Sequence, residues 1–381
     1  MEVKKIMAVQ ELIRNKKYKI DIPLGYNGSK RIRHIETFLG GKKEAILREN
    51  ELKLSIKNNT YINKNKITVE QLLNEWLEYS KTVWSPKTYV SNKHWVENIN
   101  KSIGHILLKN LNVKLLEDFY IELRTTTNYS DKTIQHHYTI ISTALNKAVV
   151  WGYILNNPNI RIEKPKIKKK EIECYSPEEV EKLVTALQNE CIKYQALIML
   201  ALDSGARRGE ITGLTWDDID FNKSTININK TTQYLKEYGI FEKDTKTATS
   251  NRTIYISQTT LDLLKRYQTQ QLERKMHLGN KWQNSNRVFT TEYGADMHPD
   301  TPSQILERII KKHNLKRITF HGLRHTSISL QISSGIQAQI ISRRAGHSNV
   351  TVTHNTYSHF FENEFQDVAN VMQELLTVQV N

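Results

Sequence analysis

The stretch "DSGARRGEITGLTW", residues 203–216, decides how the rest of the chain is interpreted. An apolar run typical of a helix ends just before Gly205, a residue that lets the backbone turn. Arg207 follows the turn, and Glu210 falls in the first turn of the next predicted helix. Taken alone, these two residues are most simply interpreted as an i,i+3 ion pair on a helix surface. Any further role depends on what other parts of the chain supply.

Three more short motifs follow in chain order. The first is "KDTKTATSNRTIYI", which puts Lys246 at the mouth of a predicted hairpin, where a solvated lysine is ordinary. The second is "HGLRHTSISL", which places His321 and Arg324 one helical turn apart, so that both side chains can face one point. The third is "RRAGHSNVTVTHNTYSH", which supplies His347 after a glycine and Tyr357 ten residues further on. Each motif alone has an ordinary structural explanation.

A zinc site is one alternative for the histidines. His321 and His325 have the H-x-x-x-H spacing of zinc peptidases, but Gly322 stands where that chemistry needs a glutamate. Arg324 would also place a positive charge against the metal. The chain carries no G-x-x-x-x-G-K-[ST] motif for a nucleotide phosphate either. We therefore predict neither a metal site nor a bound cofactor.

Together the four motifs resemble those of the tyrosine recombinases, in particular the lambda-type integrases of phages and integrative elements. That family carries an arginine in G-x-R-x-G-E, a hairpin lysine, H-x-x-R, G-H and a tyrosine about ten residues on. This register selects Arg207 rather than Arg208, and Ser204 stands where a threonine is common. The catalytic residues that the resemblance implies are Arg207, Lys246, His321, Arg324, His347 and Tyr357.

The resemblance also implies a reaction. The family cleaves and rejoins DNA through a 3′-phosphotyrosyl intermediate, which would here integrate or excise a phage or conjugative transposon. Tyr357 is expected to attack the phosphorus, with His321 accepting the phenolic proton and Lys246 as the acid for the leaving 5′-oxygen. His347 is expected to bond a phosphate oxygen or to align the nucleophile. Two guanidinium groups suit the nonbridging oxygens, because their planar forks bind two oxygens at once.

The net charge of the 381-residue chain is +15, and most of it lies in two segments. Residues 1–66 hold 16 lysines and arginines against 7 acidic residues, a net charge of +9. Residues 161–171 hold 6 against 2, a net charge of +4. Basic residues gathered in this way predict a polyanionic partner, most commonly nucleic acid. The candidate DNA contacts are Lys17, Lys19, Lys30, Arg31, Arg33, Lys166, Lys168, Lys169 and Lys170.

The chain is expected to be a multidomain α+β protein. A period-two pattern followed by a helical pattern predicts a small basic sheet with one helix at the start. Four helical patterns then predict a bundle, and a charged linker leads to a mostly helical domain with a small antiparallel sheet. The expected domains are 1–66 (arm-type DNA-binding), 67–163 (core-binding, helical), 164–171 (basic linker) and 172–381 (catalytic).

Several finer expectations accompany these domains. Thr68 and Gln71 have the spacing of a capping box at the start of the bundle. The adjacent histidines 136–137 are expected at solvated or DNA-facing positions of its last helix. In the last domain, strands are expected near residues 224–229 and 251–257.

The partners follow from the resemblance. Double-stranded DNA with core and arm sites is the implied substrate, with an excisionase and a host DNA-bending protein as further partners. Residues 361–375 carry an apolar stripe at helical spacing, which either packs on its own domain or docks onto a neighbouring protomer in a DNA-bound homotetramer. No apolar run approaches the ~20 residues that span a bilayer. With Cys174 and Cys191 as packing residues, we expect a protein of the bacterial cytoplasm.

Two other functions stay open. A type IB topoisomerase or a chromosome-dimer resolvase would keep the fold and change the reaction, although resolvases typically lack a basic N-terminal sheet. A DNA-binding regulator without catalysis would not need Tyr357 together with both arginines. Phage and conjugative-transposon integrases share these motifs, so the resemblance implies either source.

Overall fold

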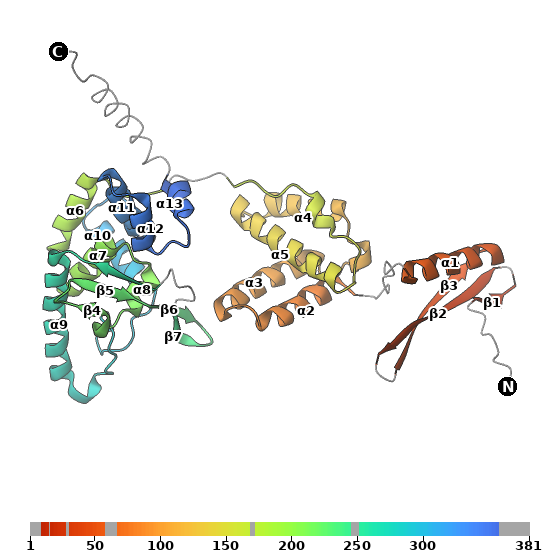
Figure 1. The fold of residues 1–381 in the computed structure, drawn as a ribbon, viewed down its shortest axis with the longest axis horizontal. Helices are drawn as coiled ribbons and strands as arrows, with labels where there is room; N and C mark the ends of the chain where they lie inside the picture. Colours follow the sequence, from red (N-terminus) through yellow and green to blue (C-terminus); the bar gives the residue numbers. More distant parts are fainter. Residues whose placement is uncertain are drawn as a thin grey trace, which may run out of the picture. The chain divides into compact units, whose positions relative to one another are not determined.

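The computed structural model, drawn as a ribbon in Figure 1, divides the chain into two units, Met1–Lys169 and Lys170–Asn381. Its helical and sheet-containing parts confirm the predicted multidomain α+β class. Among the described residues, no helix is long and apolar enough to cross a membrane. The structure describes residues 9–14, 16–27, 30–57, 67–167, 172–244 and 251–357.

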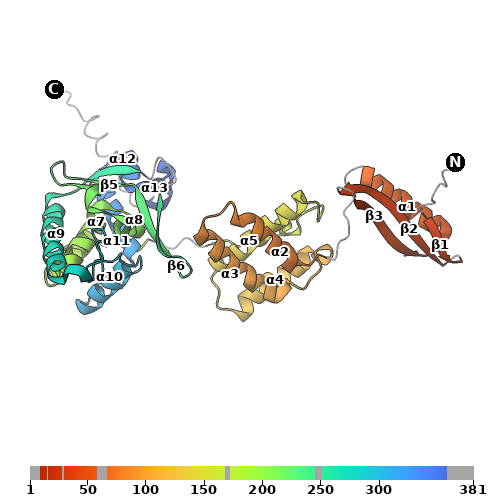
Figure 2. The same ribbon diagram turned by 90° about the horizontal axis from the view of Figure 1, so that it is seen from below.

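The first unit begins with a sheet and one helix, which are β1 (Val9–Ile13), β2 (Lys17–Asn27), β3 (Lys30–Leu39) and α1 (Lys42–Lys57). The strands are antiparallel in the order β1-β2-β3, and α1 packs on one face of the sheet (Figure 2). Ile20 and Ile22 of β2 are buried on that face against Leu52 of α1. Strand β1 was not predicted, because four of its five side chains are exposed and it lacks an apolar period.

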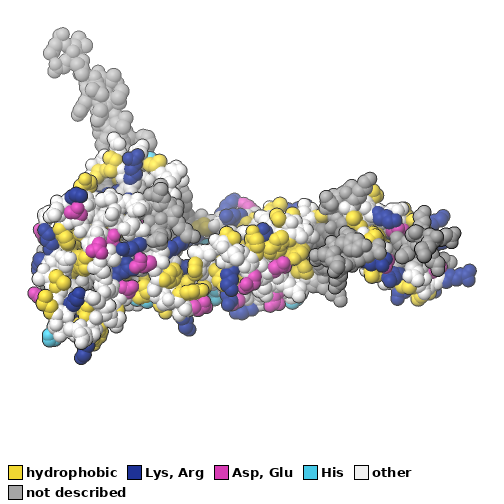
Figure 3. All heavy atoms as spheres, turned by 60° about the horizontal axis from the view of Figure 1, so that its bottom comes forward, with side chains coloured by type: hydrophobic (Ala, Val, Ile, Leu, Met, Phe, Trp, Pro, Cys, Tyr) yellow, Lys and Arg dark blue, Asp and Glu magenta, His cyan; other side chains and the backbone are white. Residues whose placement is uncertain are grey.

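The other face of this sheet is open, and it carries basic residues that alternate with the buried residues along β2 and β3. Lys17 and Lys19 alternate with buried side chains along β2 and therefore point to the open face. Arg33 precedes a buried residue of β3, so it points to the open face as well. Arg33 forms an ion pair with Asp21 at 2.7 Å, and Ile35 is exposed beside them. Lysine and arginine side chains reach the surface of this part of the chain in Figure 3. The open face is therefore a mixture of positive charge and exposed apolar surface.

A helix bundle follows, with the elements α2 (Val69–Lys81), α3 (Pro86–Ile103), η1 (Leu108–Asn110), α4 (Val113–Thr126), α5 (Asp131–Val150) and η2 (Pro158–Arg161). The predicted capping box is confirmed: Thr68 accepts from the backbone of Gln71, whose side chain bonds back to the Thr68 backbone. Because a cap satisfies backbone N–H groups that have no partner within the helix, such residues mark where helices begin. The other bundle helices are capped by Ser85, Asn112 and Ser130.

The expectation for His137 is wrong, because its side chain is fully buried in the bundle. The ring centroid lies 5.1 Å from that of Trp95 and 5.6 Å from that of Tyr129, and Nδ1 bonds the carbonyl oxygen of Thr133 at 2.9 Å. Burial lowers the pKa of His137, so the ring is neutral and serves as a packing group. His136 is exposed, as predicted.

The second unit is mostly helical. Its helices are α6 (Pro177–Leu187), α7 (Ile192–Ser204), α8 (Arg208–Gly213), η3 (Trp216–Asp218), α9 (Gln258–Leu278), η4 (Gly279–Lys281), α10 (Thr301–Lys312), α11 (Phe320–Ser333), α12 (Ala338–Ala345) and α13 (Val350–Tyr357). Its strands are β4 (Ile219–Asp220), β5 (Thr225–Ile228), β6 (Lys230–Leu235), β7 (Gly239–Asp244) and β8 (Arg252–Tyr255). Helix α7 lies at the centre, where it contacts α9, α10 and α11.

Two small sheets belong to this unit. The first has the order β4-β5-β8, and its antiparallel β5–β8 pair confirms the strands predicted near 224–229 and 251–257. The second is the hairpin β6–β7, and its two strands, residues 230–235 and 239–244, were not predicted. Its sequences "KTTQYL" and "GIFEKD" are too polar to show an alternating apolar pattern. The hairpin is stable because it packs on α8 rather than because of its own composition.

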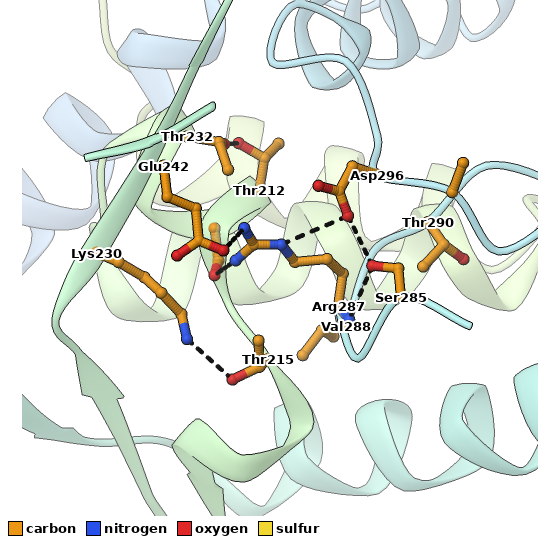
Figure 4. Close-up of polar contacts among 12 residues, drawn as sticks. Thr212, Thr215, Lys230, Thr232, Glu242, Ser285, Arg287, Val288, Thr290 and Asp296 are labelled. Atoms are coloured by element: carbon orange, nitrogen blue, oxygen red, sulfur yellow. Dashed lines mark hydrogen bonds and ion pairs between the residues drawn. The ribbon is translucent and has the colours of Figure 1, made fainter. Parts of the chain in front are cut away.

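A buried arginine attaches this hairpin to the rest of the unit (Figure 4). Arg287 is 3% exposed and donates to the carbonyl oxygen of Gly213, at the end of α8, and to the carboxylate of Glu242 on β7. Its Nε lies 3.7 Å from Asp296, which in turn accepts a bond of 2.6 Å from Ser285. One guanidinium therefore links α8, β7 and the segment that precedes α10.

Arg287→Met should lower the free energy of unfolding of this unit by about 2–4 kcal/mol, because a buried carbonyl loses its donor and two carboxylates lose a cation. Urea unfolding monitored by tryptophan fluorescence measures the change. The control is Arg274→Met, since Arg274 forms a comparable ion pair with Glu292 but its side chain is 48% exposed. That variant should change stability by about 0–1 kcal/mol. Equal effects of the two variants would contradict the prediction.

Candidate active site

Arg207 is positioned by its neighbours in the sequence. Gly205 ends α7 in the left-handed conformation, with φ of 60°, and Arg207 then stands at the N-cap of α8. Its backbone N–H donates to Oε2 of Glu210 at 2.9 Å, and Nη1 donates to Oε1 of the same residue at 2.8 Å. Gly209 permits the close approach of β6, because a Cβ there would lie 2.8 Å from the carbonyl oxygen of Thr232. Gly205 thus permits the turn after α7, and Gly209 permits the packing of β6 against α8.

Glu210 is a buried carboxylate between two arginines. It is 3% exposed, and Arg252 of β8 donates from Nη2 to its Oε2 at 2.8 Å. Burial by itself would raise the pKa of Glu210, but the bonds and charges of Arg252 and Arg207 outweigh it, so the pKa is lowered. Arg252 was not predicted from the sequence as a site residue, although it follows Lys246 in the motif "KDTKTATSNRTIYI". The predicted Arg207–Glu210 ion pair is confirmed. The carboxylate of this pair is buried, whereas the side chain of Arg207 is partly exposed.

Arg324 is the second arginine of the site. It lies on α11, is 3% exposed, and donates from Nη1 to the carbonyl oxygen of Gly205 at 2.7 Å. Burial and the charge of Arg207 lower the pKa of Arg324 to about 10, so it is still a cation at neutral pH. Arg207 donates in the same way to the carbonyl oxygen of Gly346 at 2.7 Å. A guanidinium has five N–H donors, so both arginines keep donors beyond these carbonyl bonds.

Tyr357 lies at the end of α13 with 1% of its surface exposed. Its hydroxyl is 2.6 Å from Nδ1 of His325, and the two ring centroids are 5.6 Å apart. Burial raises the pKa of the Tyr357 phenol although Arg324 acts in the opposite direction. His321 contacts the ring of His325 edge to face, at 4.6 Å and 80°. From the sequence, Tyr357 was paired with His321, and His325 was considered only as a zinc ligand.

His347 lies within electrostatic range of the same arginines. It follows Gly346, which is left-handed with φ of 68° and packs against the guanidinium of Arg252. Nδ1 of His347 is 2.8 Å from Oγ1 of Thr353, a residue of α13. Burial first, and then the charges of the surrounding arginines, lower the pKa of His347 to about 4. His347 is therefore neutral at pH 7 and is bonded to the helix that carries Tyr357.

The structure brings five of the six predicted catalytic residues into one unit, while Lys246 lies outside the described residues. The apolar segment 361–375 also lies outside them. Among the described residues, no group of three His, Cys, Asp or Glu side chains could hold a metal ion.

Of the candidate DNA contacts, Lys166 is exposed and pairs with Glu163 at 2.8 Å. Five other candidates lie on strands β2 and β3, namely Lys17, Lys19, Lys30, Arg31 and Arg33. The remaining three, Lys168, Lys169 and Lys170, are outside the described residues.

The chain is similar to known proteins in sequence and in fold. The model described as "Phage integrase family" matches residues 174–364, and "Phage integrase SAM-like domain" matches residues 68–162. A "Tyrosine recombinase XerC-like" protein of Caldanaerobacter subterraneus subsp. tengcongensis is 27% identical, over 94% of this chain and 96% of the relative. The ICEBs1 integrase of Bacillus subtilis is 27% identical, over 97% of this chain and 100% of the relative. The Tn1549 transposon integrase in complex with a circular intermediate DNA has a similar fold, with a TM-score of 0.69 and 19% identity. The match covers 82% of this chain and 100% of the Tn1549 chain.

Glu210→Gln should lower the free energy of unfolding at pH 7 by about 3–5 kcal/mol, because two arginines lose the buried carboxylate between them. The pKa of Glu210 is below its ordinary value of 4.5 in the folded chain. The ionised carboxylate therefore stabilises the fold fully above pH 4.5, and this contribution is lost as the pH falls through the lowered pKa.

Denaturant unfolding of both proteins between pH 7 and pH 3 measures this difference, which should shrink in the acid range. The exposed residue Glu237 provides the control variant, Glu237→Gln, which should match the wild type at every pH. A pH-independent gap between Glu210→Gln and wild type would contradict the assigned charge.

Proposed function

The chain belongs to the phage integrase family, and we propose that its Tyr357 cuts and rejoins DNA through a 3′-phosphotyrosyl intermediate. The enzyme class is that of the tyrosine-type site-specific recombinases. One observation carries the choice of residues: two arginines and a tyrosine from distant parts of the sequence share one site. The charges of Arg207 and Tyr357 both act on the pKa of Arg324, so the three groups lie within electrostatic range.

The proposed cleavage is an exchange of esters. The phenolic oxygen of Tyr357 bonds to a DNA phosphorus while the bond from phosphorus to the 5′-oxygen breaks. A histidine, His321 by family resemblance, takes the phenolic proton, and Lys246 gives a proton to the 5′-oxygen. Arg207 and Arg324 bind the nonbridging oxygens. Attack by a 5′-hydroxyl on the phosphotyrosine reverses the step, so the bond energy is conserved and no high-energy cofactor is consumed.

The electrostatics of the site fit this reaction. Burial keeps Tyr357 protonated in the free chain, so the phenol needs a positive field and a base to become a nucleophile. Arg207, Arg324 and Arg252 supply that field with Glu210 as the buried counter-charge. His347 is proposed to bond a phosphate oxygen or to align the nucleophile through α13. Loss of either phosphate-binding arginine should slow cleavage by about 10²–10³ or more.

The DNA is proposed to be bound at two kinds of site. The open face of the N-terminal sheet, with Lys17, Lys19 and Arg33, suits a DNA groove whose phosphates bind the basic residues. The bundle and the catalytic unit would bind the core site where cleavage occurs, with the basic segment 164–171 along the backbone. Names such as ICEBs1 integrase and Tn1549 transposon integrase support a mobile element as the source of these sites.

A homotetramer on DNA is proposed from the stoichiometry of the reaction. Recombination between two duplexes exchanges four strands, and each chain supplies one Tyr357, so four chains are needed. Residues 361–375 are proposed to link the protomers, and an excisionase and a DNA-bending protein to set the direction. The resolvase alternative draws support from the relative described as XerC-like, whereas the basic N-terminal sheet favours an integrase. A purely regulatory role would give DNA binding without covalent chemistry.

Tyr357→Phe should bind DNA but form no covalent adduct, because the attacking oxygen is missing. The substrate is a nicked, end-labelled duplex that carries the recombination site and loses its short strand on cleavage. The measurement is a denaturation-resistant, labelled protein band. Tyr255→Phe is the control, since Tyr255 is 72% exposed on β8, and it should give the wild-type yield. A band that persists in Tyr357→Phe would overturn the assignment of the nucleophile.

The triple variant Lys17→Ala, Lys19→Ala, Arg33→Ala should weaken binding to arm-site DNA and flatten its salt dependence. Each lost phosphate contact reduces the slope of log K against log salt by about 0.9, so the expected change is about 2–3. The matched control substitutes Lys42, Lys43 and Lys53 of α1, the helix on the other face of the sheet. Identical slopes for the two triple variants, measured by fluorescence anisotropy, would show that the open face does not bind the phosphates.

A further inference from the structure

We infer that His325, rather than His321, receives the phenolic proton of Tyr357 when the nucleophile attacks. The inference rests on the proposed function of Tyr357 and deepens the chemistry of the same site. It gives a catalytic role to a histidine that the H-x-x-R motif does not include. It also leaves His321, which is exposed whereas His325 is half-buried, to face the DNA.

Geometry is the first argument. Nδ1 of His325 lies 2.6 Å from the Tyr357 hydroxyl, which is within the range of a hydrogen bond and of direct proton transfer. His321 lies one helical turn earlier on α11, and its contact is with the ring of His325. A proton that leaves Tyr357 therefore meets Nδ1 of His325 before it can reach His321.

The charge state of His325 allows it to accept a proton. Burial first, and then His321 and Arg324, lower the pKa of His325 to about 4, so the imidazole is neutral at pH 7. A neutral imidazole has one donor and one acceptor nitrogen. The protonated phenol of Tyr357 can donate to Nδ1 when His325 carries its own proton on Nε2, and proton transfer from Tyr357 uses this tautomer. The charged and titratable groups around His325 are His321 and Arg324 on its own helix, Tyr357 on α13, and His347, whose pKa His325 also lowers.

A bound phosphate would make His325 a stronger base. The phosphodiester brings a negative charge to Arg207 and Arg324, and this charge opposes the effect of Arg324 on the imidazole. The pKa of His325 should therefore rise when DNA binds. In the attack, the O–H bond of Tyr357 breaks, the O–P bond forms and the P–O5′ bond breaks, while Nδ1 becomes protonated and Lys246 gives its proton to the leaving 5′-oxygen. The imidazolium returns this proton to Tyr357 when a 5′-hydroxyl rejoins the strand.

Two substitutions at this position separate proton transfer from packing. In His325→Asn the amide oxygen stands where Nδ1 stands, so it can accept the Tyr357 hydrogen bond but cannot take the proton. His325→Leu removes both functions. The matched variant is His321→Asn. The measurement is the rate of adduct formation on the nicked duplex between pH 5 and pH 9, with DNA affinity measured in parallel.

His325→Asn should lower the rate by about 10²–10³ with unchanged DNA affinity, and the acid limb of the pH–rate profile should disappear. In the wild type this limb arises because a protonated imidazole cannot accept the proton, and its midpoint should lie above the free-chain pKa of about 4. His321→Asn should keep the limb. Imidazole added to His325→Gly should restore part of the rate, which a purely structural role would not allow.

Two outcomes would overturn the inference. A wild-type rate in His325→Asn with a defect only in His325→Leu would assign the residue to packing and positioning. Loss of the acid limb in His321→Asn, with the limb intact in His325→Asn, would return the base to the H-x-x-R histidine. Failure of the proposed function has a different signature, because the wild-type chain would then form no adduct on this duplex at any pH.

Discussion

The site depends on one buried carboxylate, that of Glu210. It accepts hydrogen bonds from Arg207 and Arg252, which come from α8 and β8 and are 45 positions apart in the numbering. Arg207 also donates a hydrogen bond to the carbonyl oxygen of Gly346, and Arg252 donates one to the carbonyl oxygen of Arg344, each at 2.7 Å. The end of α12 and the start of the segment that carries Tyr357 are therefore attached to α8 through two guanidinium groups. A buried charge with this many bonds is costly to disturb, so the geometry is rigid.

Positive charge exceeds negative charge in this site, and the excess explains its chemistry. Arg207, Arg252 and Arg324 surround a single buried carboxylate, and their charge contributes to the low pKa of His347. Burial is the main cause of the neutral histidines and of the protonated tyrosine in the free chain, and the positive charge adds to its effect on the histidines but opposes it on Tyr357. A phosphodiester would supply the missing negative charge, and the pKa values of His325 and His347 would then rise, because an anion favours the protonated imidazole. The free chain is thus arranged for an anion.

Much of the fold was predictable from local sequence. The start of the bundle was found because Thr68 satisfies a backbone N–H group three positions along the chain. Strand β1 and the hairpin β6–β7 were missed, since their stability comes from packing partners and not from an apolar period of their own. His137 was misplaced for the same reason: its polarity suggests a solvated position, but aromatic neighbours from other helices bury it.

The sequence by itself determined the residue types, their order and their neighbours within one helical turn. It placed His321 and Arg324 on one side of a helix and paired Arg207 with Glu210, because α-helical spacing makes such contacts unavoidable. Only the tertiary structure decided that Tyr357 meets His325 and that Arg252 closes the site. His321 and His325 are both on α11, and their spacing does not distinguish them as partners of Tyr357. The packing of α13 near α11 makes that choice, since contacts between distant segments are set by how helices fit against a shared core.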